Sequence, residues 1–211
     1  MGRLIVIFAL LFSLYATRHG WMPAHSLSAE ELQIVLAAEP EQTKPEDDSV
    51  IFWTWSDSTV QITPLFDYRM VARVMGTKRY RFDREARYSP LDLLVTWGPA
   101  ADPALDDYVD WSQSARFGFF EYQALPPGID NQTIGVHMAN THLIPADDDV
   151  ADRMGDIHRG DLVEIEGMLV TLREEWDDGR WYAWTSSTTR EDTGAGACEV
   201  ILVQNVRING A

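Results

Sequence analysis

The chain carries the residue types of a nucleophilic hydrolase. His142 is a candidate general base, and Cys198 and Ser186 are candidate nucleophiles. A thiol or hydroxyl is a weak nucleophile until an adjacent base removes its proton, so the chemistry requires the histidine to lie beside one of them. Their separation along the chain leaves open whether they meet. The competing interpretation gives His142 and Asn140 structural hydrogen bonds in a loop.

The aromatic content allows binding as the alternative to catalysis. The chain has 8 tryptophans in 211 residues, and tryptophan combines a large contact area with a polar N–H group. These side chains could form a platform for a glycan or for a partner protein, or they could fill the core. The candidate binding residues are Asn140, His142, Trp184 and Arg190.

The motifs for metals and cofactors are weak. His137 and His142 do not have the spacing of a paired zinc site on a strand face or on a helix. The acidic run Asp147–Asp149 lacks the pattern of a calcium loop, so it is expected to cap a helix. Asp192–Ala195 reads DTGA, as in aspartic proteases, but a second copy to share the proton is missing from the sequence. Arg159–Asp161 reads RGD, which a helix stop followed by a strand explains. We therefore expect no metal and no cofactor.

The charge of the chain excludes two classes of partner. It has 17 Lys and Arg against 33 Asp and Glu, a formal net charge of −16. A nucleic-acid backbone or an anionic membrane surface is bound by clustered basic residues, so neither is expected as a partner. The single cysteine, Cys198, cannot form an intramolecular disulfide.

The N-terminus predicts export. Residues 4–16 are apolar and uncharged and follow Arg3, which suits the central region of a signal peptide better than a full membrane span. Cleavage near the small-x-small pattern Ala24–Ser26 and retention as a membrane anchor both fit. We assign residues 1–26 as a signal peptide or signal anchor. The remainder is expected in the periplasm or cell envelope, secreted or anchored in the inner membrane.

Residues 27–49 are expected to form a short helix and an acidic linker. Ser28 and Glu31 have the spacing of a capping box, which predicts a helix over residues 29–38. Residues 39–48 are polar, acidic and contain prolines, which is typical of a solvated linker.

Residues 50–211 predict one domain of mainly β (α+β) fold. Apolar residues alternate with period two in short segments separated by turn residues, as in an antiparallel sheet. We expect a small antiparallel barrel or sheet of the OB or SH3-like kind, with a few short helices. The expected strands are residues 51–55, 59–63, 68–74, 78–82, 117–122, 162–172, 181–187 and 198–208.

Local signals place the turns and helices of this domain. A serine or aspartate before a proline predicts helix starts at residues 89–92 and 102–103. Apolar residues at i, i+4 and i+7 predict a helix over residues 150–157, ended by Gly160. Asp178 and Gly179 predict a hairpin turn.

One expected strand changes its apolar phase at Gly167. Val163 and Ile165 have one parity, and Met168, Val170 and Leu172 have the other. A β-bulge at Gly167 would return all five side chains to one core.

Three groups of residues have the character of a family signature. They are Tyr88–Asp92 with Trp97–Pro99, Asn140–Ala146, and Trp184–Ser187 with Arg190, Asp192–Gly194 and Gly196–Glu199. In these groups the chain resembles a family of uncharacterised bacterial exported or membrane-anchored proteins, over about residues 68–203. Residues 95–96 and 188–189 depart from the family pattern. The resemblance implies an envelope location and supplies neither a catalytic residue nor a substrate.

The sequence therefore predicts a bacterial cell-envelope protein that acts as a non-enzymatic binding or structural module. Its expected partner is an envelope protein or a glycan, and an uncleaved N-terminal segment would hold it at the membrane. The alternative is an envelope hydrolase that uses His142 with Cys198 or a serine.

Overall fold

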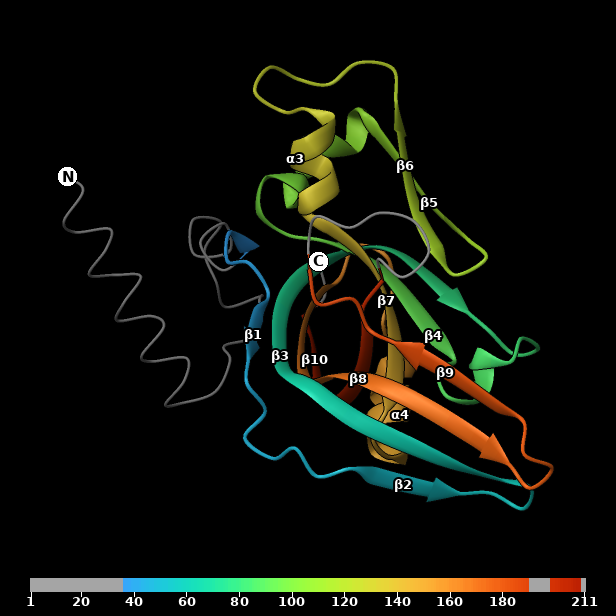
Figure 1. Cartoon of the computed structure of the whole chain (residues 1–211). Coiled ribbons are helices and arrows are strands. Elements are labelled where there is room, and N and C mark those ends of the chain that lie inside the picture. Colours follow the sequence, from blue (N-terminus) through green and yellow to red (C-terminus); the bar gives the residue numbers. More distant parts are fainter. Residues whose placement is uncertain (1–35, 190–197, 210–211) are drawn as a thin grey trace.

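The fold is mainly β, as the sequence predicts. The computed structural model describes residues 36–189 and 198–209, and Figure 1 shows curved strands with a few short helices. The predicted leader, nearly all of the predicted helix 29–38, Arg190 and the DTGA motif lie outside the described residues.

Five strands of the main sheet close into a ring. The strands are β1 (Glu41–Thr43), β2 (Ile51–Thr54), β3 (Ser58–Arg79), β4 (Leu91–Thr96), β5 (Val109–Ser114), β6 (Phe117–Tyr122), β7 (Met138–Pro145), β8 (Leu162–Trp176), β9 (Trp181–Thr185) and β10 (Val200–Asn209). Strands β3, β4, β7, β10 and β8 pair in this order, and β8 also pairs with β3. The path thus returns to its first strand. Strands β7 and β10 are parallel, and the other pairs of the ring are antiparallel.

One hydrophobic cluster joins all five strands of the ring to helix α4 (Asp148–Gly155). Val150 and Met154 of α4 are buried in this cluster, followed by Ile157. The Asp147 side chain accepts a hydrogen bond from the backbone N–H of Val150 at 2.8 Å, so the acidic run caps the helix. The predicted helix is confirmed, but it ends at Gly155 rather than at Gly160.

A second hydrophobic cluster lies on the opposite face of β8. The odd-numbered residues Val163, Ile165 and Leu169 belong to the first cluster. The even-numbered residues Met168, Val170 and Leu172 belong to the second cluster. The side chains of β8 therefore alternate regularly between the two faces of the strand. The first part of the strand buries one face in the first cluster, and the later part also buries the other face in the second cluster, which explains the change of apolar phase seen in the sequence.

The predicted bulge at Gly167 is wrong. The extra residues lie in the partner strands instead, at Gln204 of β10 and at Leu65 of β3. Gly167 has a different role, because a Cβ atom built on it would lie 2.1 Å from the carbonyl oxygen of Leu202. Glycine is needed here for the close approach of the β10 backbone.

Three local predictions are also corrected. The expected strands 59–63 and 68–74 and the start of 78–82 are parts of the single long strand β3. Residues 91–96 form β4 and not a helix after Ser89, because every side chain of this strand is buried in the sheet. The expected solvated linker contains β1, which pairs with β3, and the Glu46 N–H donates to Asp67 at 2.9 Å.

The other local predictions hold. A 3-10 helix runs over Pro103–Asp107, and the Asp102 side chain accepts from the Ala104 N–H. The turn between β8 and β9 places Gly179 at a φ of 84°. The sequence missed helix α3 (Asn131–Val136) and strands β5 and β7. Asn140 and His142, which were expected in a loop, lie on β7. Figure 1 shows α3 beside the β5–β6 hairpin, at the end of the molecule opposite α4.

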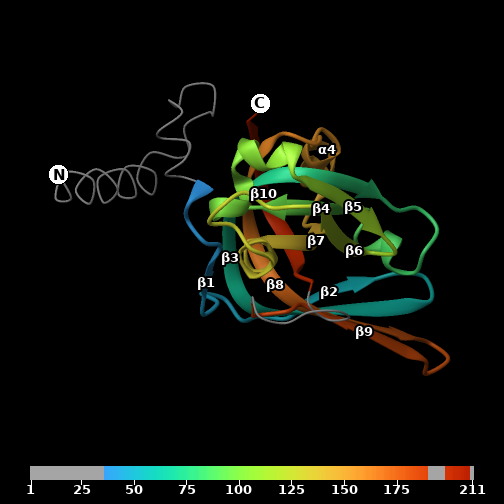
Figure 2. The ribbon, with the colours of Figure 1, turned by 90° about the horizontal axis from the view of Figure 1, so that it is seen from above.

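Strands β2, β3, β8 and β9 continue as a four-stranded extension of the ring. Figure 2 shows β2 and β9 on either side of the far ends of β3 and β8. One face of this extension carries Val60, Ile62 and Leu172 of the second cluster, with Trp53 and Trp184 packed against them.

Candidate functional site

A pocket of about 400 Å³ lies where the extension meets the ring and the β5–β6 hairpin. Four parts of the chain contribute side chains to it: the β3–β4 connection, the β5–β6 turn, β7, and the segment from β9 to the start of β10. The lining residues are Asp83, Glu85, Ala115, Arg116, Phe117, His142, Tyr182, Trp184, Thr185 and Cys198.

The pairing of three strands places His142 in this pocket. In the sheet register His142 of β7 lies between Asp92 of β4 and Val200 of β10. Its imidazole ring also lies against Trp184, with ring centroids 4.6 Å apart and an interplanar angle of 44°. The His142 side chain is only 4% exposed, so its position is fixed by these neighbours.

Asp92 is the buried anion beneath His142. Its Oδ1 lies 2.9 Å from His142 Nδ1, with both side chains buried. The distance suits an ion pair, but Nδ1 lacks the alignment of a hydrogen bond and has no other partner among the described residues. The contact is an ion pair only when the imidazole is protonated. The same Oδ1 accepts a hydrogen bond from Arg116 Nη1 at 2.9 Å, so the carboxylate is paired with a permanent cation, which it shares with Asp83.

Arg116 connects the β5–β6 hairpin to the ring. Its guanidinium donates two hydrogen bonds to Asp83, at 2.9 and 2.8 Å, and one to the carbonyl oxygen of Ser89 at 3.1 Å. It also stacks on the ring of Tyr80, 3.9 Å from the centroid. These groups and Asp92 take four of the five guanidinium N–H groups, and the two carboxylates outnumber its single positive charge, so Arg116 shapes the pocket and is a poor site for an anionic ligand.

The hairpin turn that carries Arg116 is strained. Ala115 and Arg116 have φ angles of 49° and 67°, the left-handed conformation that asparagine and glycine adopt more readily. Such strain persists only where surrounding contacts hold the backbone, and it is concentrated at functional sites. Here the contacts of the Arg116 side chain hold it.

Asn140 supports the hairpin rather than the pocket. Its Nδ2 donates to the Arg116 carbonyl oxygen at 2.9 Å, and its Oδ1 accepts from Gln113 at 2.7 Å. The side chain is buried and does not line the pocket. The sequence allowed a structural role for both Asn140 and His142. Asn140 has that role, whereas His142 lines the pocket.

The structure brings two of the three hydrolase candidates together. His142 and Cys198 line the same pocket, and the partly buried Cys198 sulfur lies 3.8 Å from the Arg116 carbonyl oxygen. Ser186 is not a nucleophile in this pocket. Its hydroxyl donates to the Ser187 carbonyl oxygen at 2.7 Å and accepts from the Val200 N–H at 3.0 Å, so it ties two strands together.

Tyr182 and Glu85 form the polar wall of the pocket. The Tyr182 hydroxyl donates to Glu85 Oε1 at 2.7 Å. Burial and the neighbouring Glu85 carboxylate raise the pKa of Tyr182, so the phenol stays protonated at neutral pH. Burial raises the pKa of Asp83, but the hydrogen bonds and charge of Arg116 outweigh it, and the pKa lies below the usual range.

A second buried carboxylate holds the wall in place. Glu174 of β8 is fully buried and accepts hydrogen bonds from Ser58, at 2.5 Å, and from Tyr88. Arg87 completes the site with an ion pair at 2.9 Å, and its guanidinium stacks on Trp55 at 3.6 Å. Because Arg87 is the last residue of the short helix Glu85–Arg87 and Tyr88 follows it, this network positions Glu85 at the pocket.

The sequence missed most of the polar groups of the site. Asp92 was assigned to a helix start, and Arg116 and Tyr182 were not candidates. A usable signal was present, since the apolar–polar alternation of residues 109–112 and the aromatic segment 117–122 lie on either side of a short connection that contains Ala115 and Arg116, the two-residue turn of the hairpin.

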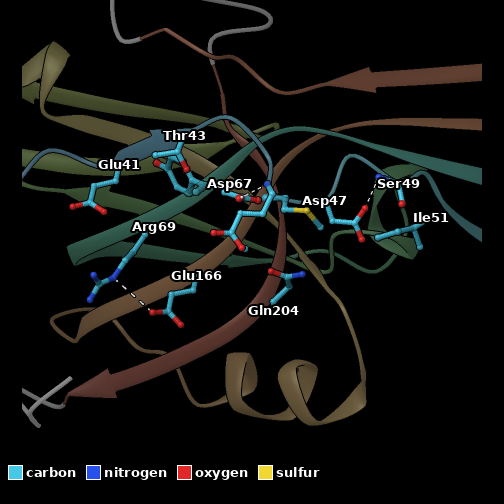
Figure 3. A pocket seen from close by; sticks show the side chains of 13 residues that line it. Glu41, Thr43, Asp47, Ser49, Ile51, Asp67, Arg69, Glu166 and Gln204 are labelled. Carbon is cyan, nitrogen blue, oxygen red and sulfur yellow. Dashed lines mark hydrogen bonds and ion pairs between the residues drawn. The ribbon is translucent and has the colours of Figure 1, made fainter. Parts of the chain in front are cut away.

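A larger pocket of about 520 Å³ lies where the β1 segment crosses β3 and β8 (Figure 3). Among the described residues that line it, Arg69 is basic and five are acidic. The acidic residues are Glu41, Glu46, Asp47, Asp67 and Glu166. Asp47 and Asp67 accept backbone N–H bonds from Ser49 and Glu46. Across residues 36–189 and 198–209, His, Cys, Asp and Glu side chains do not gather in a group that could hold a metal ion.

The smaller pocket combines aromatic surface with hydrogen-bond acceptors. Phe117, Tyr182 and Trp184 offer aromatic surface, and Glu85, Asp83 and Thr185 offer oxygen atoms that can accept hydrogen bonds. Comparison with protein-family models, curated proteins and solved structures finds no match to this chain.

Proposed function

We propose that this chain is a non-enzymatic binding module of the bacterial cell envelope, and that its pocket binds a neutral oligosaccharide. The observation that carries the proposal is the grouping of three aromatic side chains with acceptor oxygens around one pocket, whose lining among the described residues includes one arginine, Arg116, already paired with Asp83 and Asp92. Sugar rings stack their apolar faces on aromatic rings while their hydroxyl groups donate to such oxygens.

The topology supports the same conclusion. We infer that the closed ring is an OB-like barrel, in which β3, β4, β7, β8 and β10 are the first to fifth strands. OB folds bind oligonucleotides and oligosaccharides at the second and third strands and at the loops after the first and fourth strands. The pocket uses these parts: Glu85 follows the first strand, His142 lies on the third, and Trp184 follows the fourth. The net charge of −16 favours the oligosaccharide over the oligonucleotide.

We expect Trp184→Ala to weaken oligosaccharide binding by at least about tenfold, because it removes the aromatic surface at the centre of the pocket. Isothermal titration calorimetry with chitohexaose, cellohexaose and maltohexaose measures the affinity. The matched control is Tyr108→Ala, an exposed aromatic residue outside the pocket, which should bind as the wild type does. Equal affinities of the Trp184→Ala and wild-type chains would contradict the proposal.

The hydrolase remains the second candidate, because His142 and Cys198 share the pocket and Asp92 lies 2.9 Å behind the histidine. We expect wild-type chain and the Cys198→Ala variant to release nitrophenol from p-nitrophenyl acetate at the same rate. A thiol activated by His142 would instead give a burst of acyl-enzyme formation. A burst that disappears in both Cys198→Ala and His142→Gln would favour the hydrolase over the binding module.

Export is tested separately from binding. None of the helices in the described part of the chain is long and apolar enough to cross a membrane. We expect a periplasm-specific reporter fused after Ala211 to be active, because the apolar segment 4–16 directs export. Deletion of residues 4–16 provides the control and should abolish the activity. Reporter activity confined to the cytoplasm would contradict an envelope location.

A further inference from the structure

The four-stranded extension has a second face that is not covered by any hydrophobic cluster of the described residues. Side chains alternate across a strand, so the residues next to the buried Val60 and Glu174 point to the other side. Two adjacent rows of this face cross the sheet in register. The first row is Phe52, Gln61, Arg173 and Ala183, and the second is Thr59, Glu175 and Trp181. We call these two rows the outer aromatic face.

The outer aromatic face has exposed rings at both ends. Phe52 on β2 is 62% exposed and Trp181 on β9 is 60% exposed, and most large apolar side chains of the described residues are buried. They lie on strands separated by three strand spacings, about 14 Å. A groove of about 420 Å³ lies on this face beside Phe52, and its lining includes Gln61 and Arg173 but not Trp181. An exposed ring at a groove, with a second exposed ring on the same face, indicates a binding surface.

The face is electrically balanced on a strongly acidic chain. Its two charged residues, Arg173 and Glu175, form an ion pair at 3.5 Å, and Arg173 also stacks on Trp181 at 4.7 Å. The chain as a whole has a net charge of −16, which opposes its approach to anionic surfaces and to its own copies. A balanced face with amide and hydroxyl groups between two rings therefore suits an uncharged polymer that carries many hydroxyl groups.

We propose that the outer aromatic face binds a neutral polysaccharide chain, with Phe52 and Trp181 stacking on separate sugar rings. This surface is distinct from the pocket, because Tyr182 and Trp184 project from the opposite side of β9. Gln61, Thr59 and the Arg173–Glu175 pair supply hydrogen bonds between the two rings. The chain then holds a polymer on one face of the extension and a shorter oligosaccharide in the pocket on the other. The proposal goes beyond the pocket function and does not depend on it.

Affinity electrophoresis in native gels tests this proposal. The probes are hydroxyethylcellulose, mixed-linkage β-glucan and amylopectin, each a soluble neutral polysaccharide. We expect at least one of them to retard the full chain, and Phe52→Ala and Trp181→Ala each to weaken the retardation by at least about fivefold. Tyr108→Ala, which alters an exposed ring elsewhere, should migrate as the wild type does. Urea unfolding of each variant confirms that truncation of these exposed rings leaves the fold intact.

Three results would overturn the proposal. The first is the absence of retardation by any of the three polymers. The second is retardation that Trp184→Ala abolishes while Phe52→Ala and Trp181→Ala do not, which would place the polymer in the pocket and leave the proposed function standing. The third is a dimer in sedimentation velocity that Trp181→Ala dissociates, which would assign the face to a second copy of the chain. Loss of retardation in the Phe52 and Trp181 variants supports the proposal whatever the pocket titration gives.

Discussion

We expect Asp92→Ala to lower the free energy of unfolding by about 3 kcal/mol or more. Asp92 is fully buried and accepts a hydrogen bond from Arg116 at 2.9 Å, and its carboxylate lies 2.9 Å from His142 Nδ1. Removal of the Asp92 carboxylate leaves a cavity. It also deprives the Arg116 guanidinium, which is 11% exposed, of one of its two anionic partners. Breaking a buried ion pair from one side is costly because the remaining charge cannot be rehydrated. Urea denaturation measures the loss.

The matched control is a pair of the same chemistry at the surface. Glu175 forms an ion pair with Arg173 at 3.5 Å, and the two side chains are 62% and 42% exposed. Glu175→Ala should cost no more than about 1 kcal/mol, because water screens an exposed pair and solvates the arginine left behind. If both variants lose the same stability, Asp92 does not hold the hairpin to the ring and the account of the site is wrong.

The second large effect is expected at Gly167. A Cβ atom at this position would lie 2.1 Å from the Leu202 carbonyl oxygen, well inside van der Waals contact. Two backbones of paired strands meet here, so neither can move without breaking ladder hydrogen bonds. We expect Gly167→Ala to destabilise the chain by about 3 kcal/mol and Gly167→Val by more.

Gly135 provides the control for backbone effects. It lies in helix α3, and a Cβ atom built on it meets no atom within 4 Å. Gly135→Ala should be neutral or stabilise the chain by up to about 1 kcal/mol, because alanine favours the helix and reduces the freedom of the unfolded chain. An unchanged urea midpoint for Gly167→Ala would show that β8 and β10 do not approach as closely as described.

The sequence predicts those parts of the fold that local rules determine. Helix α4 follows from its apolar spacing and acidic cap, and the β8–β9 turn follows from Asp178 and Gly179. The error at residues 89–92 arose because a serine and a proline suit a strand start as well as a helix start, and the burial of Asp92 in the sheet decides between them. The error at Gly167 arose because the interpretation assumed one core, whereas β8 passes between two.

The candidate site could be predicted only in part. His142, Trp184 and Cys198 were recognised as residue types, but their convergence depends on the β4–β7–β10 register and on the fold-back of β9. Such long-range pairing is not visible in any local window of sequence. Arg116 was missed for the same reason, since its role depends on Asp83 and Asp92, which are distant in the chain.

The most direct test of oligosaccharide binding in the pocket is nuclear magnetic resonance of the ¹⁵N-labelled chain during titration with chitohexaose, cellohexaose or maltohexaose. The indole signal of Trp184 is identified by its loss in Trp184→Phe. We predict that a hexasaccharide shifts this signal together with the backbone amides of Arg116 and Cys198, which line the pocket from two other segments. If none of the three sugars moves these signals at millimolar concentration, the pocket is not an oligosaccharide site.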